Sequence, residues 1–151
     1  MAIFRAITFL AASCVFATPA IAAAETDSMQ AARTFLEAFA ANPSSTKALV
    51  TSDAMVMVGD IGGPFSEFIR TAPPEAKWLA SCRVASLQSK ALPSGADMNS
   101  QDTPSWLKGG KLDLFEGAYS CIDSKGNNTQ MRVSVVLKNG RVAQFMMGPV
   151  K

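Results

Sequence analysis

The chain has 151 residues, of which 48% are hydrophobic and 17% are charged, and its formal net charge is +2. This length is typical of one domain, and the apolar content is sufficient for a folded core, which excludes a broadly disordered chain. No stripe of Lys and Arg stands out, so the sequence excludes a phosphate-contacting nucleic-acid surface and a polybasic membrane patch.

The first 24 residues have the three parts of a secretory signal peptide. Arg5 supplies the positive charge, residues 6–17 form a largely apolar stretch, and residues 20–24 are mostly small, as signal peptidase requires. We therefore expect residues 1–24 to be removed. Residues 25–151 are expected to fold as one exported domain, periplasmic or secreted, in a bacterium.

Two other interpretations of the N-terminal segment stay open. An uncleaved membrane anchor needs about 20 apolar residues to span a bilayer of about 30 Å, and this stretch is shorter. Cys14 follows small residues, as a lipidated cysteine does, but Val15 and Phe16 continue the apolar run where a polar tether is usual. We expect no membrane contact after cleavage.

A helix is predicted over residues 27–41, because four apolar residues recur there at helical spacing. Asp27 or Ser28 can cap its start, and Pro43 follows its end. A second, short helix is predicted as far as about Val50.

The next segments predict a short strand over residues 54–59, a turn over residues 60–63, and a helix that begins at Pro64. From residue 77 the apolar pattern changes to that of strands.

The four long strands are predicted over residues 77–88, 111–122, 129–138 and 141–147, with a long polar loop over residues 92–110. Helices first and strands afterwards predict an α+β fold, with the helices packed on one face of a mostly antiparallel sheet.

Asn139-Gly140 predicts a two-residue type I′ hairpin between the last two strands. Regular pairing from that turn places Val135 opposite Gln144 and Val133 opposite Met146. One face of the hairpin is then apolar with a single polar member, and we predict that it points into the core. The candidate binding residues on this face are Val133, Val135, Leu137, Met146 and Gln144.

This order of elements resembles that of the nuclear-transport-factor-2-like superfamily, which includes SnoaL-like proteins and ketosteroid isomerases. The resemblance is carried by residues 31–40, residues 54–59 with 65–70, and residues 133–147, and it spans about residues 27–149. It implies a cone-like barrel in which a curved sheet wraps a helix and leaves an apolar pocket at the wide end.

Two cysteines, Cys82 and Cys121, remain after the first 24 residues are removed. An even pair in an oxidising compartment predicts a disulfide. The chain contains no histidine and no C-x-x-C spacing, which argues against a catalytic or metal-binding thiol pair. The same lack of histidine removes the Ser-His-Asp triad and the usual zinc sites, and no cofactor or metal is expected.

The resemblance to isomerases implies a carboxylate in an apolar pocket with a tyrosine as oxyanion donor, and it makes Asp60 and Tyr119 the catalytic candidates. Desolvation would raise the pKa of such a carboxylate toward the working pH. Ordinary turn chemistry alone explains Asp60 and is the better interpretation of that residue. Asp113 and Glu116 fall on opposite faces of one strand, so those two do not pair.

The mature chain is also rich in methionine. Thioether clusters can bind copper(I), but most of these residues lie in apolar strands, so core filling is the better interpretation. The methionines concerned are Met29, Met55, Met57, Met98, Met131, Met146 and Met147.

Three functions remain open. The leading hypothesis is a non-catalytic exported module that binds a small apolar ligand or a protein partner. The first alternative is a cofactor-independent isomerase or dehydratase that uses Asp60 with Tyr119. The second alternative is a structural subunit of an envelope assembly or a homodimer, formed through the sheet face that carries Phe145 and Met147.

We predict that the exported protein begins at Ala23 or Glu25, since cleavage after Ala22 or Ala24 satisfies the small-x-small rule. The intact mass of non-reduced protein from the exported fraction measures this directly. A chain that retains Met1, or one lipidated at Cys14, would contradict the prediction.

Overall fold

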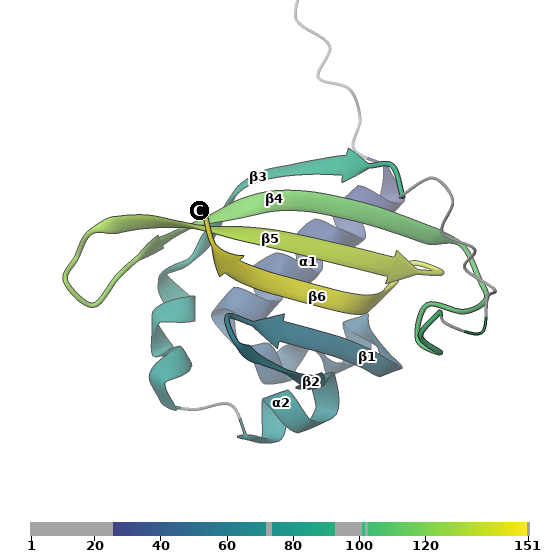
Figure 1. The fold of residues 1–151 in the computed structure, drawn as a ribbon. Helices are drawn as coiled ribbons and strands as arrows, with labels where there is room; N and C mark the ends of the chain where they lie inside the picture. The colour runs from purple at the N-terminus through teal and green to yellow at the C-terminus, as the bar shows by residue number, and fades with distance from the viewer. Residues whose placement is uncertain (1–25, 72–73, 93–100, 102, 151) are drawn as a thin grey trace, which may run out of the picture.

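A computed structural model describes residues 26–71, 74–92, 101 and 103–150, without the side chains of residues 74–77. The expected signal peptide lies outside the described residues. The predicted α+β class is confirmed, because helices pack on one face of a curved, mostly antiparallel sheet (Figure 1). The elements in chain order are α1 (Asp27–Ala41), η1 (Pro43–Leu49), β1 (Val50–Val58), β2 (Ile61–Pro64), α2 (Phe65–Thr71), η2 (Pro74–Ser81), β3 (Arg83–Lys90), β4 (Leu112–Ile122), β5 (Asn128–Lys138) and β6 (Arg141–Pro149), where η denotes a 3-10 helix.

The six strands form one sheet in the order β2-β1-β6-β5-β4-β3. The pairing of β1 with β6 is parallel, whereas the other four pairs are antiparallel. The sheet does not close into a barrel, so β2 and β3 are its edges. Helix α1 lies behind this sheet in Figure 1, and the face toward the viewer carries no described helix.

Helix α1 has the predicted bounds because its apolar residues form one continuous stripe. The side chains of Ala32, Phe35 and Leu36 are completely buried against the sheet. The cap differs from the prediction: Thr26, rather than Asp27 or Ser28, accepts a hydrogen bond from the amide of Met29.

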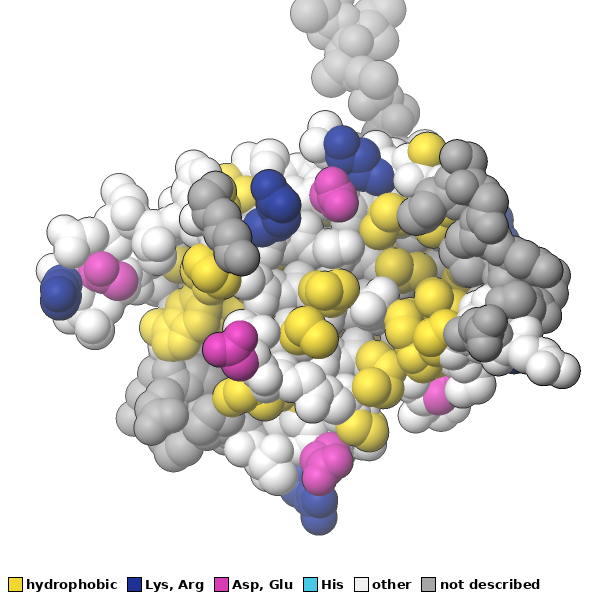
Figure 2. Space-filling view, viewed as in Figure 1, with side chains coloured by type: hydrophobic (Ala, Val, Ile, Leu, Met, Phe, Trp, Pro, Cys, Tyr) yellow, Lys and Arg dark blue, Asp and Glu magenta, His cyan; other side chains and the backbone are white. Residues whose placement is uncertain are grey.

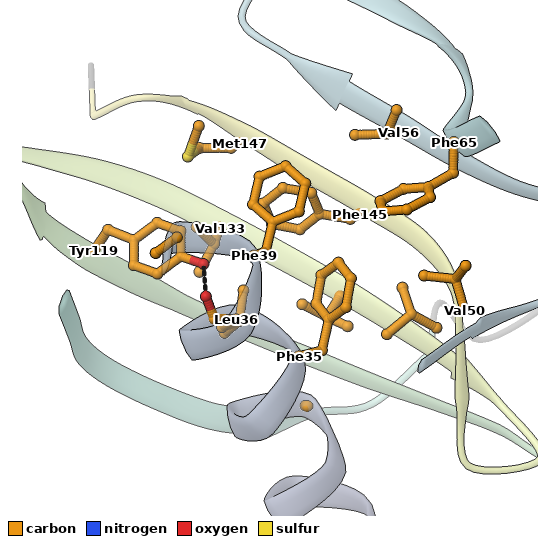
Figure 3. Close-up of a cluster of buried hydrophobic side chains, with 14 of the residues drawn as sticks. Phe35, Leu36, Phe39, Val50, Val56, Phe65, Tyr119, Val133, Phe145 and Met147 are labelled. Carbon is orange, nitrogen blue, oxygen red and sulfur yellow. Dashed lines mark hydrogen bonds between the residues drawn. The ribbon is translucent and has the colours of Figure 1, made fainter. Parts of the chain in front are cut away.

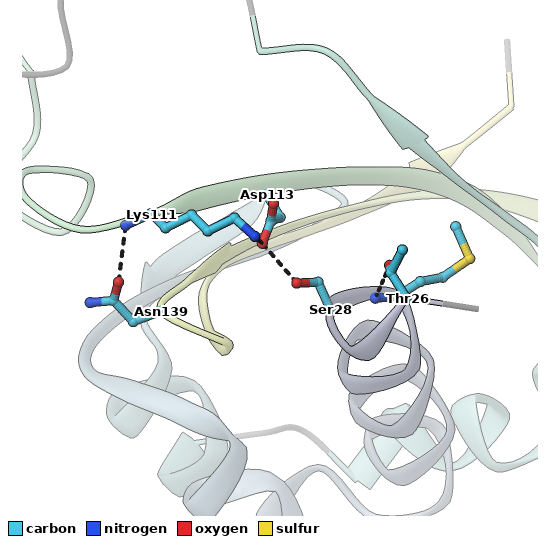
Figure 4. A network of polar contacts seen from close by, with 6 residues as sticks. Thr26, Ser28, Lys111, Asp113 and Asn139 are labelled. Atoms are coloured by element: carbon cyan, nitrogen blue, oxygen red, sulfur yellow. Dashed lines mark hydrogen bonds and ion pairs between the residues drawn. The ribbon is translucent and has the colours of Figure 1, made fainter. Parts of the chain in front are cut away.

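Ser28 instead connects the start of α1 to the sheet (Figure 4). Its hydroxyl donates to the Asp113 carboxylate at 2.8 Å, and Lys111 forms an ion pair with the same carboxylate at 3.6 Å. The Asn139 side chain accepts a hydrogen bond from the backbone amide of Lys111 at 2.9 Å. These contacts fix the position of the helix relative to β4 and to the last hairpin.

Phenylalanine rings fill the space between α1 and the sheet (Figure 3). The Phe39 ring lies 4.6 Å from that of Phe145 and 6.2 Å from that of Phe65, centroid to centroid. Phe35 lies 5.4 Å from Phe145, at the 70° tilt of an edge-to-face pair. The rings therefore form the middle of the core between α1 and the sheet.

The predicted type I′ turn is confirmed, since Asn139 and Gly140 both have positive φ, at 51° and 80°. The pairing beyond it is wrong by one residue. The ladder shifts after Leu137–Val142, so that Val136 pairs with Gln144 and the residue at 143 is bulged. A bulge inserts one residue into one strand and thereby exchanges the faces of everything beyond it.

This shift overturns part of the predicted core face. Phe145 and Met147, which were assigned to the outer face, are 0% and 3% exposed, whereas Met146 is 37% exposed and Gln144 is half-buried. Val133, Val135 and Leu137 are buried, as predicted.

The predicted strand over residues 77–88 is also partly wrong, because the chain forms η2 as far as Ser81 and enters β3 only at Arg83. The segment Pro-Glu-Ala-Lys begins η2, and these residue types favour the first turn of a helix.

Close backbone contact explains one glycine of β4. A Cβ atom at Gly117 would lie 2.1 Å from the carbonyl oxygen of Ser86, next to the point where the β3–β4 ladder shifts between Val84 and Ser86. No larger residue fits there unless β3 moves away.

The predicted disulfide is confirmed: Cys82 and Cys121 are bonded at an S–S distance of 2.09 Å. It connects the end of η2 to the end of β4. The Ser81 hydroxyl supports the same junction, since it accepts a hydrogen bond from the Ile122 amide at 3.0 Å.

We predict that replacing both cysteines, Cys82→Ala with Cys121→Ala, lowers the free energy of unfolding by about 4 kcal/mol, because the bridge closes a loop of about 40 residues in the unfolded chain. Urea denaturation of the oxidised wild type and the double variant measures the difference. Equal midpoints would show that the bridge does not form.

Candidate functional site

The open face of the sheet, opposite α1, carries exposed methionines. Met57 on β1 is 45% exposed, and Met146, its register partner on β6, is 37% exposed. Met55 points to the same side, two residues before Met57. Hydrophobic side chains lie over the middle of this face in Figure 2, with charged groups along its upper border. These three methionines are therefore not core fillers, which corrects the interpretation from the sequence.

A hollow of about 360 Å³ lies on this face, with Gly148 and Gly59 among its lining residues and with Met57 and Met146 contributing apolar surface. Gly148 is the register partner of Arg132, so both point outward. A Cβ atom at Gly148 would meet no atom within 4 Å, and its φ is not positive. The missing side chain thus leaves the space that forms the hollow.

A second hollow, of about 410 Å³, adjoins the first at Met57. Gln144 and Trp106 contribute to its lining. Gly62 on β2 lies beneath the Met57 side chain, since a Cβ atom there would be 3.5 Å from the Met57 Cε. We call the two hollows together the open-face groove; it extends from β2 across β1 and β6 to β5 and β4.

Charged side chains stand at one end of the open-face groove. Glu116 and Arg132 line the first hollow, and both also line a neighbouring polar hollow together with Lys90. The Glu116 carboxylate lies 4.0 Å from the Lys90 ammonium group. The Arg132 side chain is exposed and forms no ion pair or hydrogen bond with another residue that the structure describes.

The structure divides the candidate binding residues of the sequence analysis into two groups. Gln144 and Met146 line the open-face groove. Val133, Val135 and Leu137 are fully buried behind the sheet, where a ligand cannot contact them without displacing α1.

Sequence reasoning missed Met57, Gly148 and Arg132 as members of one site. Their meeting depends on the parallel pairing of β1 with β6, which joins segments far apart in the chain. The only local signal was an isolated glycine near the end of a strand, which often marks close approach of a ligand or another chain.

The two catalytic candidates, Asp60 and Tyr119, lie in different environments. Tyr119 is completely buried, and its hydroxyl donates a hydrogen bond to the backbone carbonyl of Leu36 at 2.5 Å (Figure 3). Asp60 is exposed in the turn between β1 and β2. Burial, with a smaller contribution from Glu37, raises the pKa of Tyr119 far above its ordinary value of 10.0. The structure therefore does not bring Asp60 and the Tyr119 hydroxyl together on one cavity.

The described residues contain no group of three His, Cys, Asp or Glu side chains placed to hold a metal ion. Among those same residues, no helix is both long enough and apolar enough to cross a membrane.

No protein-family model and no curated protein matches the chain. Several solved structures are similar to it in fold. A variant of a protein named Rd1NTF2_05 is 12% identical, with a TM-score of 0.52 over 81% of this chain and 97% of that one. A protein from Xanthomonas campestris, assigned as a calcium/calmodulin-dependent protein kinase II association domain, is 14% identical, with a TM-score of 0.50 over 80% and 84%.

These similarities and the strand order show that the chain has the nuclear-transport-factor-2-like fold. At such low identity they define the fold alone. Function has to be argued from the residues of the groove.

We predict that Tyr119→Phe lowers the free energy of unfolding by about 1–3 kcal/mol at neutral pH, because the Leu36 carbonyl loses its buried donor. Above about pH 10 the tyrosine of the unfolded chain ionises, whereas the buried Tyr119 of the native state stays protonated. The native state then binds more protons than the unfolded state, so the free energy of unfolding of the wild type falls as pH rises, by up to about 1.4 kcal/mol per pH unit. Tyr119→Phe has no tyrosine to ionise and does not lose stability in this way.

The difference in free energy of unfolding between the wild type and Tyr119→Phe should therefore become smaller as the pH rises from about 8 to 11, which urea titrations of both proteins measure. A gap that stays constant over this range would contradict the burial of an un-ionised Tyr119.

Proposed function

We propose that this protein is an exported, non-catalytic module that binds a small apolar ligand in the open-face groove. The observation that carries the proposal is a pair of adjoining hollows, about 360 and 410 Å³, that meet at an exposed methionine. Ligand sites are typically clefts of this size, mostly apolar, with a few polar groups that orient the ligand.

The disulfide supports the export part of the proposal. Such bridges persist in oxidising compartments and are rare in the cytosol. Cys82 and Cys121 are 1% and 0% exposed, so the bond is part of the core and is shielded from solvent. The signal-like residues 1–24 point to the same compartment.

The isomerase alternative receives less support from the geometry. General acid–base catalysis needs both groups within hydrogen-bond reach of one substrate. The Tyr119 hydroxyl already has a partner inside the core, and Asp60 belongs to an exposed turn.

A protein partner or a second copy of the chain could cover the same face, since Met57 and Met146 are exposed side by side. Native mass spectrometry of protein from the exported fraction separates the possibilities. A ligand adduct of a few hundred daltons on a monomer supports the proposal, and a dimer mass favours an interface.

We predict that Gly148→Leu weakens binding at least tenfold, because its Cβ atom meets no atom within 4 Å, the φ of Gly148 is not positive, and the rest of the new side chain occupies the first hollow. Titration with the neutral fluorophore N-phenyl-1-naphthylamine measures the affinity. Gln130→Leu is the matched control, since it adds an exposed leucine on β5 away from the groove.

The unfolding temperatures of both variants should match that of the wild type. If Gly148→Leu binds the fluorophore as tightly as Gln130→Leu does, the groove is not the binding site.

A further inference from the structure

We infer that the ligand is an amphiphile with one long alkyl chain and a carboxylate head, whose chain lies over Met57 and whose head binds Arg132. This inference rests on the proposed function, and it adds the chemical class of the ligand. It follows from the different character of the two ends of the open-face groove.

The apolar end suits a flexible chain. From β2 to β5 the groove crosses three strand spacings of about 4.8 Å, so it extends about 14 Å. An extended chain of about twelve carbons, with about eleven C–C bonds, has that length, since each bond of about 1.5 Å advances it by about 1.25 Å. Methionine side chains are unbranched and polarizable, so Met55, Met57 and Met146 can adjust to an alkyl chain better than branched residues can.

The polar end suits one negative charge. Arg132 stands at the border of the first hollow, opposite Gly148 in the ladder, and its guanidinium group forms no hydrogen bond or ion pair with a described residue. A guanidinium group binds a carboxylate through two parallel hydrogen bonds. The Ser134 hydroxyl lines the same hollow and can donate a third.

The neighbouring charges leave this end positive. Lys90 lies beside Glu116 at 4.0 Å and offsets its carboxylate, so these two with Arg132 carry a net charge of +1. A single anionic head balances that charge, whereas a cationic head would be repelled and a neutral head would leave Arg132 unpaired. The groove is open to solvent on one side, which an amphiphile with an exposed head tolerates.

The experiment compares two probes with the same chain. Dodecanoate and dodecanol each displace N-phenyl-1-naphthylamine from wild-type protein and from Arg132→Gln at low ionic strength. Dodecanoate should bind the wild type about tenfold more tightly than it binds Arg132→Gln, while dodecanol binds both equally. Higher salt should reduce the dodecanoate preference, because the guanidinium group is exposed.

Arg70→Gln is the matched control. Arg70 is an exposed arginine on α2 that does not line the groove, and its partner is Glu67 on the same helix. Arg70→Gln removes the same positive charge and should leave the affinities for dodecanoate and for dodecanol unchanged.

Each other outcome has a definite meaning. If both probes bind the wild type equally and Arg132→Gln changes neither, the head-group inference is wrong while the groove remains a ligand site. If neither probe nor the fluorophore binds, the proposed function itself is wrong. A wild-type dimer that dissociates in Gly148→Leu would replace both proposals with an interface between copies of this chain.

Discussion

Packing of α1 against the centre of the sheet is the constraint on which the rest of the structure depends. The rings of Phe35 and Phe39 contact Phe145 on β6, and Phe65 at the start of α2 completes the cluster. These side chains fill the space between α1 and the middle of the sheet. The candidate binding surface lies on the other face, which carries Met55, Met57 and Met146.

One inserted residue in β6 makes this division possible. Because the side chain at 143 is bulged, Phe145 joins the core, and Met146 points to the open face beside Met57. With regular pairing, Phe145 would have faced solvent and Met146 would have been buried. The bulge therefore determines both the quality of the core and the composition of the candidate site.

Structural features that depend on residues close together in the sequence, or on the residue count, were predictable. Helix α1 followed from its apolar spacing, the turn at Asn139-Gly140 from the need for positive φ, and the disulfide from the count of cysteines. The bulge was not predictable, because the contacts that accompany it, between Phe145 and a helix more than 100 residues earlier, are not visible in the neighbouring residues. The site was missed for a related reason: its members come from β1, β5 and β6, and only the assembled sheet brings them together.

The unclosed sheet has a further consequence for the two strands at its edges. An exposed edge strand offers unpaired N–H and C=O groups to any other extended chain, which promotes aggregation. Here β2 is only four residues long and ends at Pro64, which has no N–H to offer, and β3 carries Arg83 and Lys90 at its two ends. A short edge and a charged edge are two recognised means of blocking the addition of another strand, so the open sheet can stay free of fibrous association.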